Sequence, residues 1–277
     1  MEIPEAHQVV YMMFSPRNIT AWRRLRRLMK KERYDLVSCH TSLASFFTRM
    51  AMRGLKNRPK VACVAHGYLF GEESSAAKNL LFSTAERMAA PVTDLLMTTN
   101  SWDTGYAKDH KLGKQIVEVP GVGLDTHRLR PVHGEERMTL RAEWGVAEER
   151  VLFPGQVQMA PWYGAAALAV SASRSEGLPF NIMEAMYYGL PVVASQVKGY
   201  TDLLEETGAG LLYPYGDLAA CDGCIQDLIL DRELTARMGE RGQQVVEAYT
   251  LDRVLPTVMA QYGTLLPLGQ PASAEPV

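Results

Sequence analysis

The sequence has little cysteine and no apolar run that could cross a membrane. No stretch approaches the roughly 18 consecutive apolar residues that a transmembrane helix requires. The first residues, Met-Glu-Ile-Pro-Glu-Ala-His, lack the basic start and apolar core of a signal peptide. Four cysteines in 277 residues do not suggest a disulfide scaffold. We therefore expect a reduced, cytoplasmic protein.

The sequence also lacks the patterns of common metal sites. It contains no Asp-x-Asp pair. Cys221 and Cys224 are separated by two residues, as in zinc sites, but a structural zinc needs four ligands. The other cysteines, Cys39 and Cys63, lie in predicted strands far away in the sequence. We expect no bound metal and interpret the pair as small residues at the start of a C-terminal helix.

The net charge of −2 conceals an uneven distribution. Residues 1–60 contain 13 Lys and Arg against 4 Asp and Glu, a balance of +9, so the remainder carries −11. Much of the positive charge lies in residues 18–33, where Ile19, Trp22 and Leu25 recur at helical spacing. Such a helix either packs with a solvated cationic face or meets anionic lipid head groups. The stretch has no nucleic-acid-binding motif, so we expect no nucleic acid partner.

Strand-like and helix-like segments alternate along most of the chain, which indicates parallel α/β layers, and the length suits two domains. In the first half we expect strands at 8–13, 35–39, 61–65, 95–99 and 116–119, and helices at about 18–33, 42–54, 75–90 and 102–110. In the second half we expect strands at 151–153, 168–171, 192–195 and 210–213, a helix at 181–188 and a mostly helical segment at 218–265.

The most informative segment is Ser-Arg-Ser-Glu-Gly-Leu-Pro-Phe-Asn-Ile-Met-Glu-Ala-Met. Gly177 allows a tight turn where backbone can approach a ligand, and Pro179 suits the first turn of the helix that follows. Glu176 is therefore on the loop ahead of a helix N-terminus, and Glu184 projects from that helix about one turn in. Free amides at a helix N-terminus bind anions, and the carboxylates can accept hydrogen bonds from hydroxyls. Sugar hydroxyls near a phosphate fit this arrangement.

This segment resembles the E-x7-E signature of the retaining, group 1 (family-4-type) glycosyltransferases. Four other segments resemble that family's landmarks in the same order, and together they cover most of the chain from about residue 8 to residue 262. They are Tyr34–Thr41, Ala65–Gly67, Val119–Asp125 and Ala194–Gly199. The resemblance implies the GT-B architecture, with two Rossmann-like parallel-sheet domains and the active site in the cleft between them.

The expected fold is thus α/β and GT-B-like, with both domains incomplete. Residues 1–122 would form the acceptor-side domain, 123–150 the interdomain linker, 151–265 the nucleotide-sugar-binding domain and 266–277 a disordered tail. The family's first N-terminal strand, with its glycine-rich turn, has no counterpart here. In addition, Arg150 passes directly to a later strand, so the loop whose Arg/Lys pair neutralises the leaving diphosphate in the family is missing.

The resemblance also implies roles for individual residues. Glu176 would hold hydroxyls of the donor sugar, and Glu184 would hold the ribose hydroxyls. The residues that would line the donor pocket are Gly177, Leu178, Pro179 and Phe180. Apart from the resemblance, Arg174 could offer a substitute cation to the diphosphate, although a solvated side chain is favoured. His66 ends a predicted strand, so it would point from the carboxyl edge of the sheet, where ligands bind in such folds; in the family a histidine here approaches the transferring sugar. For His40, which also ends a strand, a structural role is favoured.

The function implied is transfer of a sugar from a nucleotide diphosphate sugar, UDP-linked by expectation, to a polysaccharide or lipid-linked acceptor with retention of configuration. The donor is a substrate, and no separate cofactor is expected. The alternative is a non-catalytic remnant or binding partner derived from such an enzyme, which the missing Arg/Lys loop favours. The cationic residues 18–33 would suit a peripheral position at the inner face of the membrane.

Overall fold

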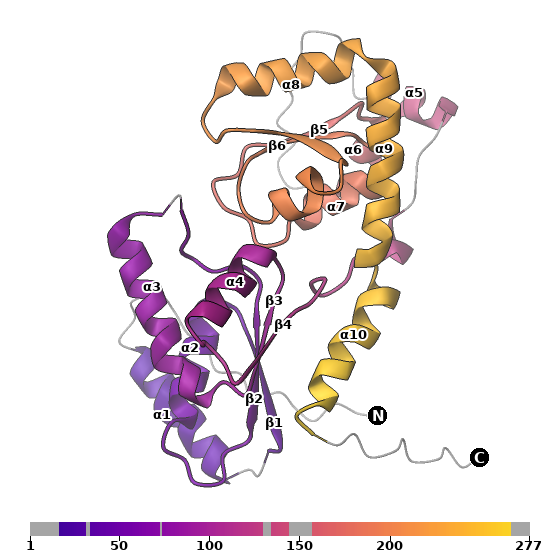
Figure 1. Cartoon of the computed structure of the whole chain (residues 1–277). Helices are drawn as coiled ribbons and strands as arrows, with labels where there is room; N and C mark the ends of the chain where they lie inside the picture. The colour runs from indigo at the N-terminus through magenta and orange to yellow at the C-terminus, as the bar shows by residue number, and fades with distance from the viewer. Residues whose placement is uncertain (1–16, 32–33, 73, 130–133, 144–156, 267–277) are drawn as a thin grey trace, which may run out of the picture. The chain divides into compact units, whose positions relative to one another are not determined.

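The computed structural model describes residues 17–31, 34–72, 74–129, 134–143 and 157–266 (Figure 1). The chain forms two compact units, one made of Met1–Val119 with Thr257–Val277 and the other of Pro120–Pro256. Each unit has its own parallel sheet, so the predicted α/β class is confirmed. The strands predicted at 8–13 and 151–153, and the predicted tail from residue 267, lie outside the described residues.

The first unit contains a four-stranded parallel sheet in the order β1-β2-β3-β4. The strands are β1 (Leu36–His40), β2 (Lys60–Ala65), β3 (Leu95–Thr98) and β4 (Gln115–Glu118). The helices are α1 (Arg17–Lys31), α2 (Ser42–Met52), α3 (Ala76–Ala89) and α4 (Ser101–Asp109), with a 3-10 turn at Ala90–Val92. All lie close to the predicted ranges. Strands β2 and β3 are short, mostly apolar runs, and α3 and α4 begin after the capping residues Ser75 and Asn100.

Alternate strand residues face opposite sides of this sheet. Cys63 and Leu96 pack against side chains of α1, α2 and α4. Val64 and Met97 face the other side, where Tyr262 and its neighbours on α10 (Leu251–Gly263) cover them. The end of α10 therefore belongs to the first unit. The predicted boundaries placed it in the second domain, because its apolar spacing does not reveal which sheet it covers.

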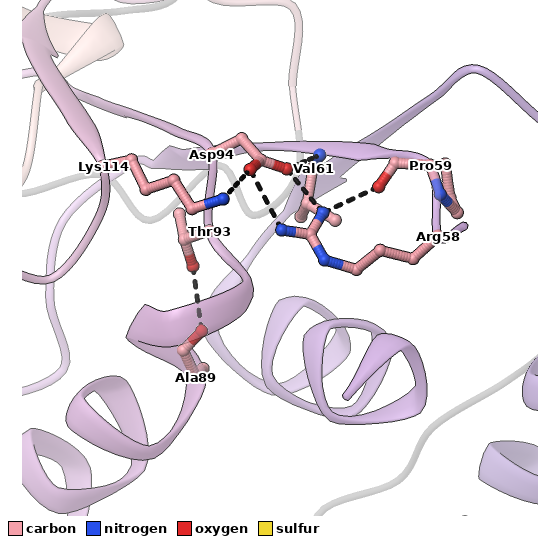
Figure 2. A network of polar contacts seen from close by, with 7 residues as sticks. All are labelled: Arg58, Pro59, Val61, Ala89, Thr93, Asp94 and Lys114. Atoms are coloured by element: carbon pink, nitrogen blue, oxygen red, sulfur yellow. Dashed lines mark hydrogen bonds and ion pairs between the residues drawn. The ribbon is translucent and has the colours of Figure 1, made fainter. Parts of the chain in front are cut away.

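A buried carboxylate ties together the amino ends of three strands (Figure 2). Asp94, just before β3, accepts hydrogen bonds from the Val61 amide at 2.9 Å, from Arg58 Nη1 at 2.5 Å and Nη2 at 3.0 Å, and from Lys114 Nζ at 2.7 Å. Burial by itself would raise the pKa of this carboxyl group. The donors from Arg58, Lys114 and Val61 outweigh it and hold the pKa of Asp94 well below its ordinary value of 3.8.

The second unit contains a three-stranded parallel sheet in the order β5-β6-β7. Its strands are β5 (Ala169–Ser171), β6 (Val192–Ser195) and β7 (Gly210–Tyr213). Its helices are α5 (Gly134–Glu143), α6 (Met159–Ala165), α7 (Phe180–Tyr187), α8 (Leu218–Leu230), α9 (Arg232–Val246) and the π-helical turn η3 (Thr201–Glu205), with 3-10 turns at Thr126–Arg128 and Glu247–Tyr249. Helices cover both faces, since Val192 and Ala194 pack with α7 and α9 while Val193 faces α8.

The segment that was predicted to be a linker belongs, where it is described, to the second unit. Leu124 is buried in the core of this unit, its amide donates to the Tyr249 carbonyl at 2.8 Å, and its carbonyl accepts from the Leu251 amide at 2.9 Å. Further along, α5 packs against α6. The turn-rich composition suggested a free connection, but the apolar side chain of Leu124 is what joins this segment to the core.

Two expectations about special segments can be compared with the structure. No helix of the described residues is long and apolar enough to span a bilayer. Cys221 and Cys224 lie in α8 and pack beside Tyr213. Cys39 and Cys63 are register partners in the first sheet, and all four cysteines are free thiols.

Candidate functional site: a glutamate pair around a helix N-terminus

The two glutamates flank the start of α7. Glu176 lies in the loop between β5 and α7, Glu184 lies within α7, and both are half-buried. The helix begins at Phe180, one residue before the predicted start at Asn181. Pro179 is its N-cap residue and makes no side-chain capping hydrogen bond. The amides of Phe180 and Asn181 lie in the first turn, at the end where a helix carries unsatisfied donors and partial positive charge.

The turn that carries Glu176 rests on a glycine of the following loop. Gly199 comes after β6 and has a φ of 88°. A Cβ atom at this position would lie 2.5 Å from the Gly177 carbonyl oxygen and 2.9 Å from that of Glu176. Only glycine permits both the backbone conformation and the close approach. Gly199 therefore sets the backbone position of the turn between Glu176 and Gly177.

Buried hydroxyl groups hold the beginning of the same loop. The Tyr200 hydroxyl and Ser171 Oγ are 2.6 Å apart, and Ser195 Oγ donates to the Ser173 carbonyl at 2.6 Å. Burial, with a smaller contribution from the charge of Glu176, raises the pKa of Tyr200, although hydrogen bonds from Ser171 and Ser173 oppose this. The phenol is thus protonated near neutral pH. These contacts tie the loop to β6, and sequence spacing gave no sign of them.

A second tyrosine supports Glu184 and was also missed by sequence reasoning. Tyr163 on α6 donates from its hydroxyl to the Asn181 carbonyl at 3.0 Å. Burial raises the pKa of Tyr163, and the charge of Glu184 and a hydrogen bond to it raise the pKa further. This tyrosine therefore stays neutral near pH 7, beside Glu184. Nothing in the pattern around Tyr163 indicates the contact, which arises only when α6 packs on α7.

The structure also shows what surrounds Gly121 and Arg174. Gly121 has a φ of 79°, and a Cβ atom there would collide with the Leu178 side chain. The Val119–Asp125 landmark thus abuts the Gly-Leu-Pro turn directly. Arg174 is exposed, and its guanidinium carbon lies 5.8 Å from the centroid of the Tyr215 ring, within range of a cation–π interaction.

His66 is the predicted site residue of the first unit. It follows β2, and its Nε2 lies 3.1 Å from Nδ1 of His40, which ends β1. Burial lowers the pKa of both histidines, and His40 lowers that of His66 further. His66 also lines a cavity of roughly 350 Å³, together with Thr41, Ser42, Arg49, Gly67 and Tyr68. The pairing of His66 with His40 was not predicted, although both histidines were expected at strand ends.

The predicted residues are thus divided between the units. His66 belongs to the first, and the donor-side residues belong to one loop and helix of the second. Those residues are Arg174, Glu176, Gly177, Leu178, Pro179, Phe180 and Glu184.

Comparison with known protein families connects this geometry to an enzyme class. A family model described as "Glycosyltransferase Family 4" matches residues 3–128, and one described as "Glycosyl transferases group 1" matches residues 127–231. The chain belongs to the group 1, family-4-type glycosyltransferases. This glycosyltransferase is 25% identical over 303 residues to a putative glycosyltransferase, EpsD, of Bacillus subtilis, with 87% of this chain and 80% of EpsD covered. Because the alignment is longer than 277 residues, EpsD contains segments without a counterpart here.

Solved structures confirm the GT-B fold. Sucrose-phosphate synthase from Thermosynechococcus elongatus superposes with a TM-score of 0.74 at 18% identity, covering 96% of this chain and 83% of that one. Anabaena Alr3699/HepE in complex with UDP-glucose gives a TM-score of 0.74 at 17% identity, covering 90% of this glycosyltransferase and 84% of that chain.

Proposed function

We propose that this glycosyltransferase binds a UDP-linked sugar through its second unit and transfers the sugar, with retention, to a lipid-linked or saccharide acceptor. The observation that carries the proposal is the uncapped start of α7, with Glu176 before it and Glu184 inside it, on a turn that Gly199 holds in place. The complex of Alr3699/HepE with UDP-glucose supports the choice of donor.

Sugar transfer requires the enzyme to stabilise two opposite charges. As the bond to the anomeric carbon breaks, negative charge grows on the departing diphosphate and positive charge on the sugar. Amides of Phe180 and Asn181 would face the diphosphate, and the helix end contributes about 0.3–1 kcal/mol at an exposed site, more where it is partly buried. Glu184 would accept hydrogen bonds from the ribose hydroxyls. Glu176 would hold the sugar and lie near its developing positive charge, and His66 would contact the sugar as well.

A second candidate function is donor binding without transfer. It is favoured by the direct passage from Arg150 to Val151, where the resembling family has its Arg/Lys loop, and by the additional segments of EpsD. Removing one well-placed stabilising donor commonly costs about 10²–10³ in rate. On the loop between β5 and α7, Arg174 could supply a cation to the diphosphate, but its guanidinium already lies near the Tyr215 ring. Binding would survive such a loss better than turnover.

We expect Glu184→Ala to weaken UDP binding by about 10- to 100-fold, and Glu176→Ala by much less. A hydrogen bond to a charged group contributes about 1.5–3 kcal/mol, and ribose is present in UDP whereas the sugar is absent. Isothermal titration calorimetry measures this, with Glu240→Ala, an exposed glutamate on α9, as the matched control. Equal losses from both site variants, or no binding of UDP to the parent chain, would contradict the donor-site assignment.

The same proteins separate the two candidate functions. With a radiolabelled UDP-sugar and lipid-linked acceptors, transfer that Glu176→Ala abolishes supports the enzyme. Binding of UDP-sugar without transfer, together with transfer by a version that carries an inserted Arg/Lys loop, supports the binding role.

We further propose that α1 attaches the protein to the inner face of the membrane. Leu25 is buried in the core of the first unit, and Arg26 Nη1 donates to the carbonyls of Ala51 at 2.6 Å and Arg53 at 2.8 Å. The apolar face and Arg26 thus fasten α1 to α2. Exposed cationic side chains of α1 include Arg23, Arg24, Arg27 and Lys30, and Lys31 at its end is exposed as well. A basic face of this kind attracts anionic head groups.

We expect replacement of the first four of these residues by glutamine to reduce binding to vesicles of phosphatidylserine and phosphatidylcholine at least tenfold, since each basic residue near the surface contributes about 1 kcal/mol. Co-sedimentation at low salt measures it. A control of equal charge replaces four exposed cations elsewhere in the unit by glutamine, namely Lys78, Arg87, Lys108 and Lys111. Binding that persists in the α1 variant, in high salt or with neutral vesicles would show a merely solvated face.

A further inference from the structure

A line of hydrogen bonds runs from α10 to His66 within the first unit. The Tyr262 hydroxyl lies 2.7 Å from Ser38 Oγ, and Ser38 Oγ lies 3.1 Å from His40 Nε2. On the other side of the ring, His40 Nδ1 lies 3.1 Å from His66 Nε2. Ser38 and His40 are exposed, whereas Tyr262 and His66 are half-buried. Strand β1, the residue after β2, and helix α10 thus contribute to one chain of hydrogen bonds.

This chain of hydrogen bonds restricts where the hydrogens of the two imidazoles can lie. A bond between two imidazole nitrogens needs one nitrogen with a hydrogen and one with a lone pair, and a neutral imidazole carries one of each. Ser38 has one hydrogen and two lone pairs, so it can donate to one neighbour while it accepts from the other. When Ser38 donates along the line, the neutral hydrogen-bond chain has two registers, in which all the hydrogens point toward His66 or all point toward Tyr262.

The phenol end favours the first register. A phenol is a stronger acid than the alkyl hydroxyl of serine, so Tyr262 is the better donor of that pair. Tyr262 then donates to Ser38, Ser38 donates to Nε2 of His40, and His40 donates from Nδ1 to Nε2 of His66. In this register Nε2 of His66 accepts, so the hydrogen of His66 lies on Nδ1.

We propose that Tyr262, Ser38 and His40 are positioning residues that fix His66 as a neutral ring with its hydrogen on Nδ1, so that it donates a hydrogen bond to an oxygen of the bound sugar. The contact with sugar rests on the proposed function. The tautomer does not, because the hydrogen bonds that set it are all within the protein.

The surroundings agree with a neutral pair. Burial lowers the pKa of both histidines. Among the charged groups that line the cavity beside His66, Arg49 and Glu86 bind each other through two contacts of 2.9 Å. Cys63, also in that lining, has a pKa raised by burial and stays a neutral thiol. The charge of Glu86 is thus balanced by Arg49, and Cys63 carries no negative charge. Neither group therefore favours a protonated, cationic imidazole.

The test uses the full chain labelled with nitrogen-15 at histidine, without ligand. Long-range proton–nitrogen spectra distinguish the two neutral tautomers and the imidazolium, and His40→Gln and His66→Gln assign the signals. In the parent chain we expect the hydrogen of His66 on Nδ1. In Tyr262→Phe and in Ser38→Ala we expect His66 to move to a mixture with a substantial Nε2–H population, because the donor that drives the register is lost. Tyr34→Phe, an exposed tyrosine of the same unit, is the control and should match the parent.

The proposal is overturned if His66 of the parent carries its hydrogen on Nε2, or if its tautomer is the same in the parent, Tyr262→Phe and Ser38→Ala. Two variants on different elements guard against a local folding defect in one. A chain that binds no UDP but shows the tautomer change would refute the proposed function alone. If UDP binds and the tautomer is unaffected, the positioning chain alone is wrong.

Discussion

Replacing Asp94 with alanine is expected to lower the free energy of unfolding of the first unit by about 3–5 kcal/mol, the usual cost of breaking a buried ion pair by removing one partner. The carboxylate is 5% exposed and accepts hydrogen bonds from Arg58, Lys114 and the Val61 amide (Figure 2). Removing it leaves the half-buried Arg58 and a strand amide without their acceptor. Hydrogen exchange of the β2 and β3 amides, which reports on this unit, measures the loss.

Asp94→Asn adds a test of pH dependence. The folded pKa of Asp94 lies below the ordinary value of 3.8, so the unfolded chain takes up the proton first as the pH falls. The stability contributed by the carboxylate is complete above about pH 5 and is lost as the pH falls through 3.8 toward the folded pKa. The difference in the free energy of unfolding between the parent and Asp94→Asn should therefore be large near neutral pH and shrink in acid. Asp109→Asn, an exposed aspartate on α4, should show almost no gap. A gap independent of pH would mean that the charge of Asp94 is not what stabilises the unit.

Local features of the sequence were enough to place most of the elements. Val192–Ser195 is a buried strand because it is a short apolar run between Pro191 and a polar loop. Helix α7 follows Pro179 and ends at Tyr187, shortly before Gly189. The glutamate pair was found for the same reason, since its residues lie within one turn and one helix. Periodicity and turn residues act over a few positions, and this part of the site is equally local.

The remaining parts depend on contacts between distant segments, which spacing does not encode. Tyr163 reaches Asn181 only because α6 packs on α7, and Tyr262 reaches Ser38 only because α10 covers the first sheet. The misplaced boundary in α10 has the same origin. An amphipathic helix shows that it needs an apolar surface but not which of two sheets provides it. Gly199 belongs to both groups, since its place in a family landmark was recognised while its contact with Gly177 was not.

Gly199→Ala is expected to destabilise the second unit by about 2–5 kcal/mol and to weaken UDP binding at least tenfold. A left-handed backbone costs a non-glycine residue about 1–2 kcal/mol, and overpacking typically adds about 1–3 kcal/mol. The obstructing atoms are the carbonyls of Glu176 and Gly177, at 2.9 and 2.5 Å from the new Cβ. Backbone cannot rotate away as a side chain does, so the turn itself must move. Displacement of that turn shifts Glu176 and the start of α7 together.

Gly208→Ala separates the two causes. Gly208 lies in the same unit with a φ of 70°, and a Cβ atom there would meet nothing within 4 Å. This variant should show only the backbone cost of about 1–2 kcal/mol and bind UDP as the parent does. Chemical denaturation and calorimetry with UDP on both variants give the comparison. If the two alanines cost the same stability and leave UDP affinity equal, the close approach of Gly199 does not position the glutamate turn. If Gly199→Ala alone loses affinity while its fold persists, the geometry of that turn, beyond the presence of its two carboxylates, is what the donor requires.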